Sequence, residues 1–281
     1  MKNGGVRKTM MGMFTDEDAL LLPSQPEIET GTAYYMAQSH MLQDQKTKLL
    51  FYQFRLKKGT PPHIRVLPDG CIDMLFSIGE ANFSKMYGSV PALKTIMLPG
   101  SGQYFGVRLP LGTVVSGRNL SMKEIFNHEY ELDGNFSCAS CLSERLNEAQ
   151  SFSERIHLFI ESFEEYIQSY DSSRNVVGYA LQKICACKGK CSISGLAEET
   201  GYSERYLRQK FCEALGFTPK HLCEVIRFRY VLLQLKQACP VNDIIFEAGY
   251  YDQAHFIKEF KKFYKQTPLQ AANRLHLFSG I

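Results

Sequence analysis

The side chains best suited to recognise a ligand lie between Ser203 and Leu215. There Arg205, Arg208 and Gln209 are spaced as residues on one face of a helix are. In a helix these three side chains share one face, and the apolar side chains of the same stretch share the opposite face. Arg and Gln carry forked groups that match the hydrogen-bonding edges of guanine and adenine in the DNA major groove. The pattern predicts a helix that buries one face and reads bases with the other. The buried set is Leu207, Phe211, Ala214 and Leu215, and Cys212 completes the outward stripe.

The same pattern occurs a second time further along the chain. Residues 193–202 match residues 241–250 at an offset of 48, and the match resumes after the turn at an offset of 49. Each copy has a short amphipathic segment, a Gly that is free to take positive φ, and a second amphipathic segment, which together predict a helix-turn-helix. Ser203 and Asp252 are the expected N-caps of the two second helices.

The second unit presents different side chains on its outward face. Its stripe begins at Gln253 and continues with Ala254, Ile257, Lys258 and Lys261. Lysines suit phosphate contacts and an outward Ile suits a thymine methyl group, so we expect weaker base discrimination from this unit. Alternatively, Ile257 packs against the helix that joins the two units.

A long helix is expected between the two units, from Pro219 to Gln237, because Pro suits the first turn and apolar residues follow along one face. Such a helix holds the two units at a fixed separation. Two recognition helices about 34 Å apart enter successive major grooves. One chain would then provide the geometry that two single units provide in a dimer. The apolar face consists of Leu222, Ile226, Tyr230 and Leu233.

Charge is distributed unevenly along the chain. Residues 180–281 carry 15 Lys and Arg against 9 Asp and Glu, a net charge of +6, whereas the other 179 residues carry 17 against 20, a net charge of −3. The basic character that attracts polyanions therefore lies in the C-terminal third. With 281 residues, of which 44% are hydrophobic, the chain is long enough for two globular domains.

The N-terminal half has the pattern of β structure. Short apolar or alternating runs between about 33 and 115 are separated by Gly and Pro turns, which predicts a barrel or a sandwich. From 152 to 170 the period becomes that of a helix with a narrow apolar seam, which either packs on its own domain or forms a dimer contact. The candidate strands are 49–56, 72–77 and 104–109, and the seam is Ile156, Ile160, Phe163, Ile167 and Tyr170.

We therefore expect an α+β chain with two domains. The first is a β-barrel or sandwich-like, cupin-like domain over 31–170, with helices at 121–170, and it follows an N-terminal extension at 1–30. The second is an all-α domain over 176–281, in which a linker helix joins two helix-turn-helix units. The polar residues 171–175 are the expected linker between the domains.

Residues 176–274 resemble the AraC/XylS family of transcriptional regulators. The resemblance implies a seven-helix DNA-binding domain that acts on double-stranded promoter DNA, with RNA polymerase as a partner of an activator. One departure is Lys265, where the family usually has Gly, so the end of the last recognition helix is expected to differ. The resemblance is carried by Gly201-Tyr202-Ser203, Tyr206-Leu207 and Phe211 in the first unit, and by Ala248-Gly249-Tyr250, His255-Phe256, Phe260-Lys261-Lys262-Phe263 and Thr267-Pro268 in the second.

The N-terminal half is similar to a sensor module of the same family, through the runs 67–76 and 105–109. Such modules usually sense a small molecule or mediate dimerisation, so the resemblance implies a small-molecule effector or a homodimer as partners. Aromatic residues of the strands either line an apolar pocket or form plain core. The candidate ligand-binding residues are Arg55, Arg65, Arg108 and Tyr52.

The nine cysteines support an alternative function. Cys138 and Cys141, together with Cys185, Cys187 and Cys191, place five thiols near the junction of the two halves. A metal or redox switch at this junction would give a thiol- or metal-responsive regulator with the same DNA reader. This alternative requires two of the cysteines to lie close in space. The competing role of the cysteines is that of small apolar residues filling the core.

The sequence has no pattern typical of an enzyme or a membrane protein. The His residues do not cluster, and neither a Gly-rich phosphate loop nor a nucleophile elbow is present, so we expect no catalysis, no cofactor and no bound metal. Without a secretory signal or an apolar run of about 20 residues, we expect a cytoplasmic protein without membrane contact. The candidate DNA-binding residues are Ser203, Arg205, Tyr206, Arg208, Gln209, Gln253, Ala254, Ile257, Lys258 and Lys261.

Overall fold

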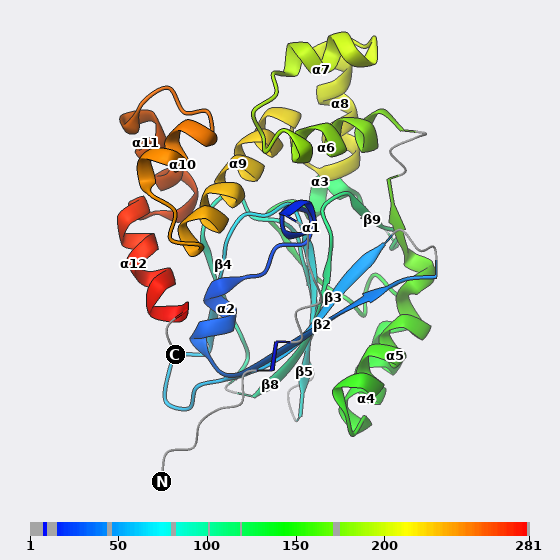
Figure 1. The fold of residues 1–281 in the computed structure, drawn as a ribbon. Helices are drawn as coiled ribbons and strands as arrows, with labels where there is room; N and C mark the ends of the chain where they lie inside the picture. Colours follow the sequence, from blue (N-terminus) through cyan, green and yellow to red (C-terminus); the bar gives the residue numbers. More distant parts are fainter. Residues whose placement is uncertain are drawn as a thin grey trace.

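The expected fold class is confirmed: a sheet-rich N-terminal part is followed by a helical C-terminal part (Figure 1). The computed structural model describes residues 8–9, 16–43, 47–79, 83–100, 102–118, 120–170 and 175–279. Over these ranges, every helix is too short or too polar to cross a lipid bilayer.

The N-terminal part is organised around one seven-stranded sheet with the strand order β1-β2-β3-β8-β5-β6-β10. All neighbouring strands are antiparallel except β1 and β2. Within the described residues the sheet does not close into a barrel, so the sandwich-like form of the expectation applies. The strands are β1 (Lys8–Thr9), β2 (Thr32–Met41), β3 (Lys48–Leu56), β5 (Ile72–Ile78), β6 (Ser84–Tyr87), β8 (Gln103–Leu109) and β10 (Glu129–Glu131).

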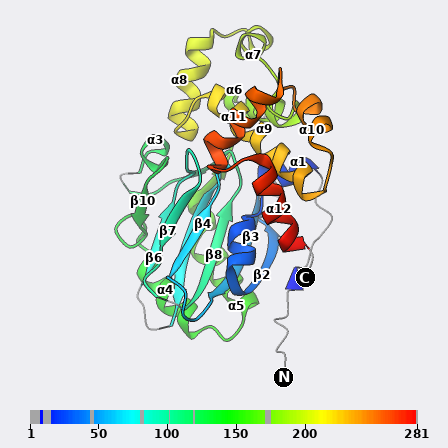
Figure 2. The ribbon, with the colours of Figure 1, turned by 90° about the vertical axis from the view of Figure 1, so that its left-hand side faces the viewer.

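Each face of this sheet buries its own core, because alternate side chains of a strand point to opposite faces. On one face Phe51 packs edge-on against Phe159 of the covering helices, with 5.7 Å between ring centroids. On the other face Tyr52 and Phe54 pack beneath a two-stranded ribbon and a short helix (Figure 2). The covering elements are α4 (Ala139–Glu148) and α5 (Phe152–Phe163) on the first face, and α2 (Pro26–Gly31), β4 (His63–Val66) and β7 (Lys94–Met97) on the second.

The helix expected over 152–170 is wrong in its second half. Helix α5 ends at Phe163, a single turn η1 (Glu164–Tyr166) follows, and β11 (Ile167–Ser169) then pairs with β9 (Thr113–Val115). Ile167 is buried in this pairing, so its apolar character serves a strand instead of a helical seam. The buried face of α5 packs on the chain's own sheet, as the first of the two interpretations expects. Of the expected linker, residues 171–174 lie outside the described part of the chain.

The helical part contains the two expected helix-turn-helix units, one at each end of a long helix (Figures 1 and 2). The first unit is α7 and α8, the second is α10 and α11, and α9 joins them. At 1.5 Å per residue, the 18 residues of α9 span about 27 Å. The helices are α6 (Val176–Ala186), α7 (Ile193–Thr200), α8 (Glu204–Leu215), α9 (Pro219–Lys236), α10 (Val241–Glu247), α11 (Gln253–Tyr264) and α12 (Pro268–Ser279).

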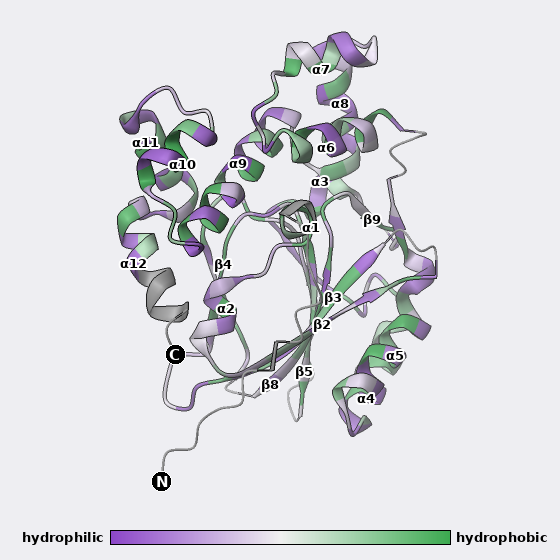
Figure 3. Cartoon of the chain, viewed as in Figure 1, coloured by the Kyte–Doolittle hydropathy of each residue, from purple (hydrophilic) through white to green (hydrophobic). Residues whose placement is uncertain are grey.

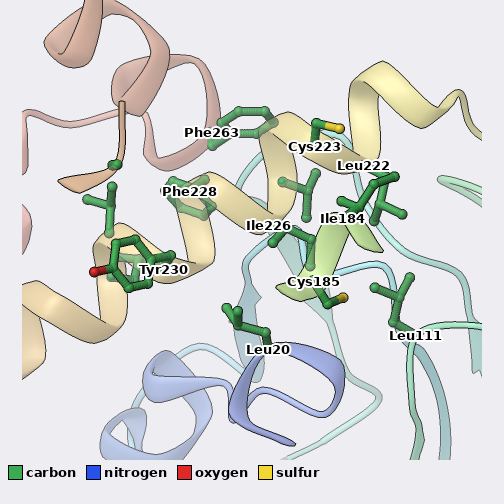
Figure 4. Close-up of a cluster of buried hydrophobic side chains, with 14 of the residues drawn as sticks. Leu20, Leu111, Ile184, Cys185, Leu222, Cys223, Ile226, Phe228, Tyr230 and Phe263 are labelled. Carbon is green, nitrogen blue, oxygen red and sulfur yellow. The ribbon is translucent and has the colours of Figure 1, made fainter. Parts of the chain in front are cut away.

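The two parts of the chain share a hydrophobic core. Leu20 of α1 (Asp16–Leu21) and Leu111 of the sheet-rich part belong to the same buried cluster as Ile226 of α9 (Figure 4). Helix α3 (Met122–Ile125) lies so close to the end of α8 that a Cβ at Gly216 would clash with the backbone of Met122. The sheet-rich part therefore contacts the helical part along α9 and at the end of the first unit.

Lys265 ends α11 in the left-handed conformation, with φ of +65°, at the place where Gly216 ends α8 with φ of +82°. The left-handed conformation raises the free energy of a residue that has a Cβ, whereas Gly adopts it without this cost. We expect Lys265→Gly to raise the free energy of unfolding by up to about 1 kcal/mol. Thermal unfolding measures this. The matched control Lys258→Gly, at an exposed position inside α11, lowers the free energy by about 1 kcal/mol, and a loss of stability in both variants would contradict the prediction.

Candidate nucleic-acid interface

Helix α8 separates its apolar and polar side chains as the sequence pattern predicts. Leu207, Phe211, Ala214 and Leu215 are buried, whereas Arg205, Arg208 and Gln209 are exposed and Cys212 is half-buried. The helix begins at Ser203, whose side chain accepts a hydrogen bond from the backbone N–H of Tyr206 at 3.2 Å. This cap fixes the start of the helix and thereby the direction of the polar stripe.

The guanidinium groups of Arg205 and Arg208 have no hydrogen-bond or ion-pair partner among the described residues, so their donors are available to a ligand. Gln209 instead donates to Glu213 at 2.8 Å. Beside the stripe, the rings of Tyr202 and Tyr206 stack at 4.6 Å between centroids. The helix thus offers two unpaired forked cations next to a small aromatic surface, a combination suited to base edges and the DNA backbone.

Helix α11 has the expected cap and a plainer outward face. The Asp252 side chain accepts a hydrogen bond from the backbone N–H of His255 at 2.7 Å. Gln253, Ala254, Lys258 and Lys261 are exposed, and the lysines suit phosphate contacts. Ile257 is half-buried and packs against the core of the helical part, which favours packing over a contact with a thymine methyl group.

A network that sequence reasoning missed positions α11 on α9. Arg227 of α9 pairs with Glu259 of α11 through two hydrogen bonds, of 2.9 Å and 3.2 Å. Tyr250 donates to the same carboxylate at 2.9 Å, and the guanidinium lies 5.2 Å from the centre of its ring. Arg227 and Glu259 are 32 positions apart, and no periodicity links them, so only the packing of the two helices brings them together.

The four candidate ligand-binding residues are held by partners within the chain. Arg108 donates to both oxygens of Asp73, at 3.0 Å and 2.7 Å, to the carbonyl of Pro23, and pairs with Asp69 at 2.9 Å. Tyr52 donates to the same Asp73 at 2.9 Å. The side chains of Arg55 and Arg65 contact Gln103 and Glu27, respectively. Four of the five N–H donors of Arg108 thus have partners in a buried ionic network.

Three cysteines gather between α6, α7 and α9. The backbone N–H of Cys191 contacts the sulfur of Cys187 at 3.1 Å, and Cys223 of α9 lies against the carbonyl of Cys191. Cys138 and Cys141 lie at the start of α4, and all nine thiols are free. Over the described residues, no group of three or more His, Cys, Asp or Glu has the geometry of a metal site.

The environment of this cluster keeps the thiols protonated. A hydrogen bond from Cys187 lowers the pKa of Cys191, but contact with Cys223 and burial outweigh it and raise the pKa to about 11. The hydrogen bond with Cys191, followed by burial, raises the pKa of the Cys187 thiol. Because the thiolate is the reactive form, both cysteines are poor nucleophiles at neutral pH.

We therefore expect the alkylation of Cys191 by iodoacetamide to accelerate about tenfold per pH unit from pH 7 to 10, without a plateau. The sign follows from the raised pKa: the thiolate fraction stays small and grows in proportion to hydroxide until the pH nears about 11. Peptide mapping of the full chain by mass spectrometry measures the rate at each pH. A rate that levels off below pH 9 would contradict the expectation.

Comparison with known proteins finds one domain family that matches the helical part and another that matches the sheet-rich part. A helix-turn-helix domain family matches residues 196–274, which include α8, α9, α10 and α11. A domain of unknown function, DUF6597, matches residues 48–131. Two uncharacterised HTH-type transcriptional regulators of Staphylococcus aureus are each 36% identical to this chain over 80 residues, 28% of this chain and 11% of the relative. The match thus spans only about a tenth of these relatives.

Two solved structures show partial likeness. Apo ToxT from Vibrio cholerae is 14% identical, with 81% of this chain and 97% of that chain covered at a TM-score of 0.44. The C-terminal domain of AraT, a response regulator from Geobacillus stearothermophilus, is 26% identical, with 35% and 84% covered at a TM-score of 0.34.

Proposed function

We propose that this chain is a transcriptional regulator of the AraC/XylS family, which binds promoter DNA through both helix-turn-helix units and controls transcription in response to a small molecule. The observation that carries the proposal is the pair of capped helices, α8 and α11, at the two ends of one helix. The first presents Arg205 and Arg208, which have no partner among the described residues, and the second presents exposed lysines. This arrangement supports base reading by α8 and mainly phosphate contact by α11.

The test is selection of bound fragments from random DNA by the full chain, repeated across a salt series. The full chain is needed because Leu20 and Leu111 of the sheet-rich part complete the core of the helical part, and an isolated C-terminal fragment would expose that surface. We expect a bipartite motif whose halves lie in successive major grooves. Retention that depends on salt but enriches no sequence would refute sequence-specific reading.

The sensing role is assigned to the sheet-rich part over 31–170, with residues 171–175 as the boundary to the DNA-binding part over 176–281. The shared core makes this role physically reasonable, because a ligand that shifts the sheet-rich part also shifts contacts with α9. A homodimer and RNA polymerase are the proposed protein partners. Sedimentation of the full chain with and without operator DNA tests the dimer.

Thiol sensing is a second candidate function, favoured by the hydrogen bond between the side chains of Cys187 and Cys191. Because both thiols stay protonated at neutral pH, their oxidation is expected to be slow there. A disulfide there would stiffen the connection from α6 to α7 and so move the first unit. Operator affinity measured before and after oxidation with diamide tests this role, with Cys187→Ser as the matched control. An affinity that oxidation leaves unchanged in both proteins would eliminate it.

A further inference from the structure

Residues 187–191, in the loop that joins α6 to α7, lie between the two helix-turn-helix units (Figure 1). This segment, Cys-Lys-Gly-Lys-Cys, begins and ends with a cysteine. Its backbone turns sharply, because Lys188 and Gly189 both adopt positive φ, of +55° and +74°. The turn brings the two ends of the segment, Cys187 and Cys191, toward each other.

The segment is held against α9. A Cβ at Gly189 would lie only 2.2 Å from the carbonyl oxygen of Cys223, so the backbone of the segment rests directly on the helix. The ammonium nitrogen of Lys188 lies 4.3 Å from the centre of the Tyr230 ring of the same helix. Helix α9 carries hydrophobic and hydrophilic residues together (Figure 3), and Cys223 is one of its buried residues (Figure 4). Packing on α9 therefore restricts how far the two ends of the segment separate.

The segment also contacts the second helix-turn-helix unit. The aliphatic part of Lys190 packs against the turn of that unit, where a Cβ at Gly249 would lie 3.2 Å from its Cδ. Helix α7 of the first unit begins at Ile193, two residues after the segment ends. The segment therefore contacts both units and the helix that joins them, so a change in its shape acts on the position of one unit relative to the other.

The two cysteine side chains of the segment contact each other. The backbone N–H of Cys191 lies 3.1 Å from the sulfur of Cys187, and the two thiols share a hydrogen bond. Both side chains are half-buried, so each keeps some contact with solvent. Cys223 also contacts the Cys191 thiol, but it is 5% exposed. Cys187 and Cys191 are thus the accessible pair of thiols in this cluster.

The protonation state of the pair restricts the ligands that it can take. Both thiols have raised pKa values and stay protonated at neutral pH. A divalent metal ion binds thiolates and would have to displace both protons, which costs more as the pKa rises. An oxidant is also attacked by the thiolate. A ligand whose own leaving groups take up the two thiol protons meets no such cost in its binding equilibrium.

A monosubstituted trivalent arsenical, R–As(OH)2, is a ligand of this kind. The reaction is R–As(OH)2 + 2 Cys–SH → R–As(S–Cys)2 + 2 H2O. The electron pair of each S–H bond forms an As–S bond, and each hydroxide leaves arsenic with its electron pair and takes the thiol proton to become water. Arsenic stays trivalent, so the step needs neither an oxidant nor a reductant. The second As–S bond closes within the protein, where the effective concentration of the second thiol is high.

We propose that Cys187 and Cys191 form a dithiol site for a monosubstituted trivalent arsenical, which bridges the two sulfurs across the turn. The bridge replaces a hydrogen bond between the thiols by a covalent ring in a segment that contacts both helix-turn-helix units. The regulatory meaning of the site rests on the proposed function, since it requires that the two units read DNA. Binding of the arsenical itself does not depend on that function.

The test is labelling of the reduced full chain, in the absence of DNA, with phenylarsine oxide, which water converts to phenyl–As(OH)2. Excess glutathione, a monothiol, then competes for the arsenical, and intact mass spectrometry measures what the protein retains. A single cysteine gives up the arsenical, whereas a dithiol retains it. We expect the chain to retain the arsenical about equally at pH 6 and pH 8, because the reaction releases no proton.

The variants are made in a Cys141→Ser chain, so that Cys138 and Cys141, which are close in sequence at the start of α4, do not act as a second dithiol. This chain should retain one phenylarsenic group. Adding Cys187→Ser or Cys191→Ser should weaken retention about a hundredfold, because only one As–S bond remains. Either variant suffices if the other does not fold. The matched control is Cys239→Ser, at another half-buried cysteine, which should retain the arsenical as the Cys141→Ser chain does.

The proposal is overturned if the Cys141→Ser chain retains no arsenical, or if retention survives both Cys187→Ser and Cys191→Ser. Loss of retention in Cys223→Ser but not in Cys187→Ser would also overturn it, since the bridge would then join Cys191 to α9. An operator affinity that the arsenical leaves unchanged would refute the regulatory role. A chain that retains the arsenical but selects no DNA sequence would refute the proposed function and leave the dithiol site standing.

Discussion

Arg208→Ala weakens specific DNA binding by about 1–3 kcal/mol, or roughly five- to 150-fold, and relaxes selectivity at one base position. Arg208 is exposed on α8 and has no partner among the described residues, so the variant removes a ligand contact without breaking a contact within the protein. A bidentate contact to guanine is the interaction that such a side chain makes in a major groove. Competition binding with the selected operator and with single-base variants of it measures both effects.

Lys261→Ala is the matched control for this prediction. Lys261 is exposed in the last turn of α11, where a single ammonium group suits a phosphate. We expect its loss to weaken binding equally for all sequences and to reduce the salt slope by about one unit. An Arg208→Ala protein with the parental base preference would show that α8 does not read bases.

Arg108→Ala lowers the free energy of unfolding by about 3–5 kcal/mol, because it leaves the buried carboxylate of Asp69 and the half-buried carboxylate of Asp73 without their cation. Arg108 is 2% exposed and pairs with Asp69 at 2.9 Å and Asp73 at 2.7 Å. It also holds the carbonyl of Pro23, and so ties the N-terminal segment to the sheet. Urea unfolding followed by circular dichroism measures the loss, since the chain has no Trp for fluorescence.

Arg145→Ala is the control, because the ion pair of Arg145 with Glu161 lies at the surface. Exposed pairs contribute at most about 1 kcal/mol, since water screens the charges. Equal losses in the two variants would show that the Arg108 network adds no more than a surface ion pair. A large loss confined to Arg108→Ala would support its role as a structural cation.

Local patterns were enough to predict the DNA-reading units. The spacing of Leu207 and Phe211 sets the buried face of α8, and the caps Ser203 and Asp252 act within three residues of their own position. The end of α11 shows the limit of such patterns. Lys265 stands where a Gly was expected, yet it adopts the left-handed conformation, and its backbone N–H donates to the carbonyl of Lys261.

Contacts with residues distant in sequence determine the secondary structure at Ile167, which the local pattern predicted wrongly, and the role of Arg108, which it left open. Ile167 continues the helical spacing of α5, but pairing with Val115 places it in a strand. Arg108 has the chemistry of a ligand anchor, but Asp69 and Asp73 occupy its donors. Each of these outcomes depends on a partner more than 30 positions away.

The two helix-turn-helix units, their linker helix and the sheet-rich nature of the first half could all be predicted from local sequence patterns. These features follow from periodicity, caps and turns, which act between residues a few positions apart. The folded chain reveals three features that these patterns do not predict: the shared core of Leu20, Leu111 and Ile226, the contact of Arg227 with Glu259, and the packing of Gly189 against Cys223 of α9. These depend on the packing of whole elements against one another, because the residues involved share no short-range spacing that a pattern could reveal.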